Sequence, residues 1–262
     1  QTVRLALSPM TDLFSYRDLV LALVARELKV RYRRSAIGFL WTMLQPLLMM
    51  AVFHAVFSTL FQFRLPSGDG ALQNYPVYTL AGLLFWNFFS QSIVASMNSL
   101  KGNAQLLQKL PVPKAVFPIA TVISGVVNLV LALVPLFFVL WFLGFAPSSA
   151  IFFLPVAILI VATFTLGAGL LLSPLAVFFA DVVEMVSVLL TLLMYLTPII
   201  YPYEVVPDKY RWIVRYNPLR SILETFRDPI YQREIPPFQH IAVSVGIALA
   251  ALAIGTWAFR RS

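Results

Sequence analysis

The sequence contains no cysteine, which excludes disulfide bonds and thiolate-bound metal ions. It has only two histidines, His54 and His240, and neither lies in a ligand pattern such as H-E-x-x-H. The phosphate-binding pattern G-x-x-x-x-G-K-[ST] and the nucleophile pattern G-x-S-x-G are absent as well. The sequence therefore predicts no metal centre, no hydrolytic site and no nucleotide bound by a P-loop on this chain.

Charge is also scarce in this sequence. Charged residues make up 11% of the chain and hydrophobic residues 60%, whereas roughly a quarter of the residues in soluble domains are charged. Together with a mean hydropathy of +0.85, this composition indicates an integral membrane protein. The first residues lack the apolar region of a signal peptide, so we expect insertion to rely on the first span. The net charge of +8 indicates contact with anionic lipid and not with nucleic acid.

A basic amphipathic segment leads into the first apolar run. Ser15 and Asp18 have the spacing of a capping box, which predicts a helix beginning there. The apolar stripe of this helix consists of Leu21, Val24, Leu28 and Tyr32, and the opposite stripe of Asp18, Ala22, Arg26, Lys29 and Arg33. Its uncharged run is too short to cross a bilayer. We therefore predict an interface helix over residues 11–35 on the cytoplasmic surface of the membrane.

Six charge-free runs, bounded by charges or by proline and glycine clusters, follow along the chain. The predicted spans are 37–63, 76–100, 115–143, 150–179, 185–201 and 238–259. Lys and Arg are more frequent in the segments that lie inside when the N-terminus is cytoplasmic, so we place both termini in the cytoplasm. The sequence thus predicts an all-α integral membrane protein with six transmembrane helices in a single domain over residues 1–262.

Two connecting segments carry further information. Residues 103–110 can form about two helical turns before two prolines stop the helix, and we expect its exposed leucines to contact a partner. A tight turn resting on lipid headgroups is the alternative. The outer segment 202–237 contains short amphipathic pieces, the second with Asn217 as N-cap and Pro218 at the first helical position. It predicts short re-entrant, gate-like helices before the last span, with a surface loop as the alternative.

Aromatic and amide side chains lie inside the predicted spans. Aromatic residues make up 14% of the chain, and their faces suit sugar rings, which present apolar C–H surfaces. Packing between helices or contact with lipid is the alternative for each ring. The second span carries a polar stripe of Asn87, Gln91 and Asn98, which lipid would not satisfy. We expect this stripe to face protein or a pore.

In this order, the segments resemble the membrane subunit of ABC-2-type polysaccharide exporters, the family that moves lipid-linked O-antigen, capsule, teichoic acid or galactan chains. The residues that carry the resemblance are ARELKVRYRRSAIGFLWTMLQP at 25–46, GLLFWNFFSQSI at 82–93, NAQLLQKLPVPKAVFP at 103–118, VFFADVVEMV at 177–186, TPIIYP at 197–202 and YNPL at 216–219. The resemblance covers nearly the full length. It has one departure, because Ala180 stands where the family commonly has an arginine. Any ion-pair role of that arginine therefore does not carry over, and the resemblance assigns no function to Asp181 or Glu184.

The resemblance implies a subunit of an ATP-driven exporter in the bacterial inner membrane, itself without enzymatic activity. Two copies of this chain would form a central channel, and each would dock on a cytosolic P-loop ATPase that holds the ATP and Mg, with no cofactor on this chain. The residues assigned to the ATPase interface are Arg26, Lys29, Asn103, Leu106, Leu107 and Lys109. The residues assigned to the channel wall are Trp41, Gln45, Phe53, Phe57, Phe61, Tyr195 and Tyr201, with Asn217 and Pro218 at the outer gate.

Two other functions stay open at this point. An intramembrane enzyme acting on lipid-linked sugars would need a carboxylate near the membrane surface, for which Asp181 and Glu184 are the inner-loop candidates. A passive channel or secondary carrier would need no ATPase. The absence of charge inside the spans argues against ion-coupled transport, which usually depends on ionisable residues there.

Overall fold

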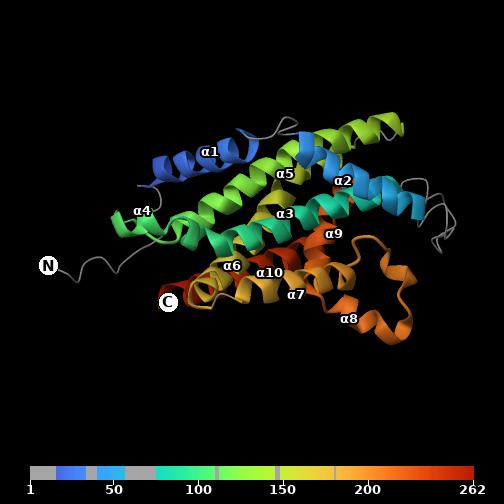
Figure 1. The fold of residues 1–262 in the computed structure, drawn as a ribbon. Helices are drawn as coiled ribbons and strands as arrows, with labels where there is room; N and C mark the ends of the chain where they lie inside the picture. Colours follow the sequence, from blue (N-terminus) through green and yellow to red (C-terminus); the bar gives the residue numbers. More distant parts are fainter. Residues whose placement is uncertain (1–15, 34–39, 57–74, 110–111, 145–147, 180) are drawn as a thin grey trace.

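A computed structural model describes residues 16–33, 40–56, 75–109, 112–144, 148–179 and 181–262, with the backbone alone at residues 32–33 and 40–43. Its regular elements are α1 (Arg17–Arg33), α2 (Leu40–Phe53), α3 (Tyr75–Gly102), α4 (Ala104–Lys109), α5 (Val116–Phe142), η5 (Ser149–Phe153), α6 (Leu154–Phe178), α7 (Val182–Leu196), η6 (Tyr203–Val205), η7 (Asp208–Tyr210), α8 (Arg211–Arg215), α9 (Pro218–Tyr231) and α10 (Phe238–Arg261). All of them are helical, which confirms the predicted all-α class for the described residues (Figure 1).

Among the described residues, four helices are long and apolar enough to cross a membrane. They are α3, α5, α6 together with η5, and α10. The segments Leu44–Val56 and Val182–Leu196 are apolar but shorter, and much of the predicted first span lies outside the described residues. The α7 helix, which covers most of the predicted fifth span, ends at Leu196, because Thr197 adopts an extended conformation before Pro198, which disfavours a helical residue ahead of it.

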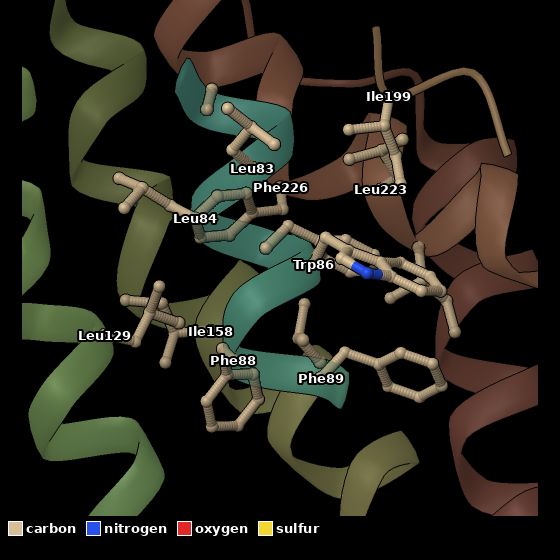
Figure 2. Packing of buried hydrophobic residues seen from close by; sticks show 14 of the residues in the cluster. Leu83, Leu84, Trp86, Phe88, Phe89, Leu129, Ile158, Ile199, Leu223 and Phe226 are labelled. Carbon is tan, nitrogen blue, oxygen red and sulfur yellow. The ribbon is translucent and has the colours of Figure 1, made fainter. Parts of the chain in front are cut away.

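The α3 helix forms the centre of the bundle. It packs against α5, α6 and α9, and its side chains are buried along most of its length. In Figure 2, Leu129 of α5 and Ile158 of α6 lie on one side of α3, and Leu223 of α9 lies with Ile199 on the other. Since residues on several sides of α3 meet protein, this helix can carry polar side chains that lipid would exclude.

The α6 and α10 helices touch through their backbones. A Cβ added at Gly255 would lie 2.8 Å from the carbonyl carbon of Gly167 and would overlap its carbonyl oxygen. A Cβ at Gly167 would in turn meet the backbone of Ala251 and Leu252. Small residues permit this close approach, in which van der Waals contacts replace a hydrophobic driving force.

The α1 helix buries a stripe that is shifted from the predicted one. Val20, Leu23 and Val24 are buried, whereas Leu21 is 62% exposed. The stretch LVLALV at residues 19–24 contains no polar residue, so packing against α5 selects the buried side there. The predicted capping residue, Ser15, lies outside the described residues, and α1 begins at Arg17.

The α9 helix is buried more completely than its amphipathic pattern predicts. Leu219, Ile222 and Phe226 are buried as expected. Arg227 and Asp228 are buried too, at 5% and 7% exposure, although charged residues of an amphipathic helix usually lie on its polar side. The cause is contact on several sides, since α9 packs against α3, α6 and α10.

Candidate functional site

A polar cavity of about 720 Å³ opens between α1, α2, α3 and α5. Its wall includes all three amides of the stripe predicted in the second span, Asn87, Gln91 and Asn98, so the stripe faces this cavity, where Gln91 and Asn98 are exposed. The other polar residues of the wall are Arg26, Glu27, Arg31, Gln45, Ser92, Ser99, Asn103, Thr121, Ser124 and Asn128. Amides and hydroxyls both donate and accept hydrogen bonds, which suits a neutral, hydroxyl-rich ligand or a file of water.

Within the part of the wall that the structure describes, charge is confined to α1. Arg26, Arg31 and Glu27 are its charged residues, and Glu27 is its one carboxylate. Acid–base hydrolysis by a pair of carboxylates therefore has no second partner among the lining residues. Among the described residues, the wall presents mainly neutral amide and hydroxyl groups.

Two side-chain hydrogen bonds fasten α1 over the cavity. The Arg26 Nη2 donates to Asn103 Oδ1 at 2.9 Å, and Thr121 Oγ1 donates to Glu27 Oε1 at 3.0 Å. Asn103 stands between α3 and α4, and its side chain Nδ2 donates to the carbonyl of Ser99 at 2.8 Å. These contacts connect α1 with α5 and with the junction of α3 and α4.

The short α4 helix lies beside this junction. The main-chain carbonyl of Asn103 accepts from the amides of Leu106 and Leu107 at 3.0 and 3.1 Å, so the same residue starts α4 and holds Arg26. Asn103 therefore links the start of α4 to α1. No sequence pattern indicated that Asn103 pairs with Arg26, because the two are separated by 77 positions.

The leucines of α4 face their own protein more than the sequence predicted. Leu106 and Leu107 are half-buried against a cluster that we call the α4-end cluster. Its buried members are Val20, Leu23, Val24, Leu100, Val116, Phe117 and Ala120. The exposed residues of α4 are Ala104, Gln105, Gln108 and Lys109, while Leu110 lies outside the described residues. A partner that approaches α4 would meet its polar side first.

At the opposite end of α3, two tyrosines hold the non-helical segment 197–201. Tyr75 donates its hydroxyl to the carbonyl of Ile200 at 2.8 Å. The hydroxyl of Tyr78 lies 3.0 Å from the carbonyl oxygens of both Pro198 and Tyr201. We call these two tyrosines, the segment 197–201 and Arg227 the outer clamp.

Arg227 completes the outer clamp from α9. Its Nη1 donates to the carbonyl of Pro198 at 2.8 Å, and its guanidinium lies 3.8 Å from the centre of the Tyr78 ring. Sequence reasoning missed this residue, although it directly follows the buried Phe226. Asp228, the next residue, is buried enough to raise the pKa of its carboxyl to about 7, and the nearby positive charge of Arg227 only partly opposes this shift.

Asn217 caps α9 as predicted. Its Oδ1 accepts from the amide of Leu219 at 3.0 Å, and Pro218 occupies the first helical position. The same side chain donates to Thr197 Oγ1 at 3.0 Å. Asn217 therefore joins the start of α9 to the end of α7, beside the outer clamp.

The residues predicted to line a channel are spread over α2 and the end of α7. Gln45 lies in the wall of the polar cavity, and Phe53 packs, half-buried, against the bundle core. Tyr195 is 64% exposed, and the hydroxyl of Tyr201 donates to its carbonyl at 2.8 Å. Trp41 lies in α2 with the backbone alone described, and Phe57 and Phe61 lie outside the described residues. The channel assignment stays a prediction.

Comparison with known proteins gives a consistent result. Residues 18–231 match the family described as ABC-2 type transporter. A Myxococcus xanthus protein named O-antigen export system permease protein RfbA is 35% identical over 250 residues, which cover 93% of both chains. A Klebsiella pneumoniae protein of the same name is 29% identical over 245 residues, 93% of this chain and 92% of that one. The Escherichia coli polysialic acid transport protein KpsM is 23% identical over 236 residues, 90% and 86% of the two chains.

Proposed function

Because this chain belongs to the ABC-2 type transporter family, we propose that it is the membrane-spanning subunit of an ATP-driven exporter of lipid-linked polysaccharide. In this proposal ATP and Mg bind to a separate cytosolic ATPase, and two copies of each subunit assemble in the bacterial inner membrane. The sequence lacks a P-loop, so in this proposal a partner supplies the energy for transport. The relatives, whose names describe permease and transport proteins for O-antigen and polysialic acid, support the substrate class.

The observation that carries the proposal is the Arg26–Asn103 hydrogen bond. It connects α4, whose polar side is exposed, with α1, which lies over the polar cavity. A partner that pulls on α4 would therefore change the mouth of the cavity through one contact. This arrangement fits a subunit that receives mechanical work from outside the membrane and uses it to move a polar cargo.

The distribution of basic residues supports a cytoplasmic location for this end of the bundle. Arg260 and Arg261 occupy the last turn of α10, and Lys101 and Lys109 the last turns of α3 and α4. Figure 1 draws α1, α4 and the C-terminus toward the same end of the molecule. Lys and Arg concentrate on the cytoplasmic side of membrane proteins, so both termini would be cytoplasmic.

The exposed side of α7 supports a second copy of the chain. Its exposed large apolar residues are Met185, Val188, Leu189, Leu192, Tyr195 and Leu196. In the proposed dimer, α7 and α2 of the two copies would enclose the conduit, and the aromatic residues predicted from the sequence would contact passing sugar rings. The short helices of the segment 202–237, among them α9, would be re-entrant. Together with the outer clamp they would form the outer gate.

Vesicles that contain this chain and its ATPase test the proposal. We expect uptake of lipid-linked polysaccharide that requires ATP, and we expect Asn103→Ala to lower uptake about tenfold while the ATPase still binds. Arg17→Gln is the matched control, because Arg17 is an exposed α1 residue whose ion pair with Asp18, at 3.6 Å, lies away from the cavity wall.

Three outcomes would contradict the proposal. Nucleotide-independent flux would indicate a passive channel or secondary carrier. ATP hydrolysis by the chain alone would remove the need for a separate ATPase. Sugar transfer that is lost in Asp181→Ala or Glu184→Ala would indicate an enzyme, although both carboxylates are exposed at the start of α7 and neither lines the polar cavity.

A further inference from the structure

A second cavity, of about 300 Å³, lies at the α4 end of the bundle. It shares no lining residue with the polar cavity. Its wall is formed by Leu100, Lys101, Ala104, Leu107, Gln108, Lys114, Pro174, Val177, Phe178, Phe259 and Ser262. We call it the lysine groove, and it brings together the ends of α3, α6 and α10 with α4 and the start of α5.

The groove combines an apolar wall with a basic rim. Leu100 and Pro174 are buried in its wall, and Phe259 is half-buried. Lys101 and Lys114 are exposed, no acidic residue lines the groove, and neither lysine forms an ion pair with a carboxylate of the described chain. The groove therefore presents two unneutralised ammonium groups beside apolar surface, which is complementary to an amphiphile with an anionic head.

Aromatic residues around the groove indicate its depth in the membrane. Trp257 is 57% exposed, and the guanidinium of Arg261 lies 4.3 Å from the centre of its ring. Phe178 and Phe179, at the end of α6, are 67% and 63% exposed. Exposed tryptophan with a neighbouring cation is typical of the lipid headgroup level, so the groove opens at that level.

We propose that the lysine groove binds one anionic phospholipid of the cytoplasmic leaflet, with its phosphate between Lys101 and Lys114 and its upper acyl chain against Val177 and Phe178. A protein loop is the less suitable occupant, because the apolar surface continues onto exposed side chains at the end of a membrane helix. The bound lipid would connect α4 with α6 and α10, since residues of all three line the groove. The leaflet assignment rests on the membrane orientation given under the proposed function.

Lipid retention by the purified chain tests the site without the ATPase. Native mass spectrometry of the wild-type protein with added phosphatidylglycerol should show one tightly retained lipid, while phosphatidylcholine should be retained less. The double variant Lys101→Gln, Lys114→Gln should bind phosphatidylglycerol at least about tenfold more weakly, because each lysine near a lipid surface contributes substantially to anion attraction. Lys209→Gln, an exposed lysine of η7, is the matched control and should bind like the wild type.

Equal retention of phosphatidylglycerol by the double variant and the wild type would overturn the proposal, and so would an equal loss in the control variant. A polyprenyl phosphate that displaces phosphatidylglycerol at equal concentration would overturn it as well, because the groove would then be a carrier-lipid site. Failure of the proposed export function would look different, since transport would be absent while lipid retention still depended on Lys101 and Lys114.

Discussion

Tyr78 connects α3 with two segments that lie far away in the sequence, and no sequence pattern predicted these contacts. Its hydroxyl reaches two carbonyl oxygens of the segment 197–201, and its ring lies under the guanidinium of Arg227. An arginine buried without these contacts would carry a desolvation cost of several kcal/mol. Tyr78 thus stabilises both the segment after α7 and the charge of α9.

Removing only the hydroxyl of Tyr78 should separate these two effects. We expect Tyr78→Phe to lower the free energy of unfolding by about 1–2 kcal/mol, because the hydrogen bond is lost while the ring under Arg227 is kept. Thermal unfolding in detergent measures the change. Tyr195→Phe is the control, since Tyr195 is exposed; an equal loss in both variants would contradict the role given to the outer clamp.

Asp228 should make the stability of the protein depend on pH. Burial raises the pKa of its carboxyl from 3.8 to about 7, so the folded state favours the neutral form. Its contribution is therefore fully present below about pH 4 and is lost as the pH rises through 7. Asp228→Asn keeps the neutral form at every pH and should stabilise the protein by on the order of 2–4 kcal/mol at pH 8.

Melting temperatures of this variant and the wild type between pH 4 and pH 9 check the expectation. The two curves should converge below about pH 4, separate progressively between pH 4 and pH 7, and keep a constant separation above about pH 7. A constant difference across the whole range would contradict the assignment of the pH dependence to Asp228.

Among the helices, α6 and α10 have the contact that is least tolerant of added volume. Gly255→Ala places a methyl group against the backbone of Gly167, which cannot rotate away as a side chain could. We expect a loss of about 1–3 kcal/mol in the free energy of unfolding. Gly246→Ala on the same helix meets nothing within 4 Å and is the matched control. Identical thermal unfolding of both variants would show that the two helices do not meet through these glycines.

The sequence predicts helices better than it predicts which of their sides are buried. Charge-free runs identify α3, α5, α6 and α10 with ends close to those observed, because crossing a bilayer requires length and low charge. The buried stripe of α1 could not be predicted in the same way, because the stretch LVLALV has no polar residue to mark an exposed side. Contact with α5 determines which of its residues are buried. The apolar spacing in α9 correctly predicts its buried leucine, isoleucine and phenylalanine side chains. It does not predict the burial of Arg227, which depends on helices far away in the sequence.

In the candidate site, too, local features could be predicted from the sequence, whereas contacts between distant residues could not. The amide stripe of Asn87, Gln91 and Asn98 was recognisable because neutral polar residues inside a span need partners. The pairing of Arg26 with Asn103 was not, since no local spacing relates two residues separated by 77 positions. Capping of α9 by Asn217 was predictable because the N-cap and the proline after it are neighbours.

For the whole molecule, the proposed channel can be tested by cysteine chemistry, because the native chain has no cysteine. In the complex with its ATPase, Tyr195→Cys should react with a water-soluble thiol reagent during ATP turnover. Leu249→Cys should stay unreactive, since Leu249 is an exposed apolar residue of α10 on which we expect lipid. Protection of Tyr195→Cys throughout the cycle would exclude this residue from the conduit.

The outer clamp has a consequence for the order in which the chain is made. The carbonyls that accept from Tyr75 and Tyr78 lie 125 and 120 positions further along the sequence. At roughly 5–20 residues per second, a ribosome needs roughly 6–24 s to reach them after it has made these tyrosines. During that interval the hydroxyls of α3 have to bond to water, lipid or the insertion machinery. The central helix of the bundle is thus synthesised early but acquires its final neighbours only after α9 has left the ribosome.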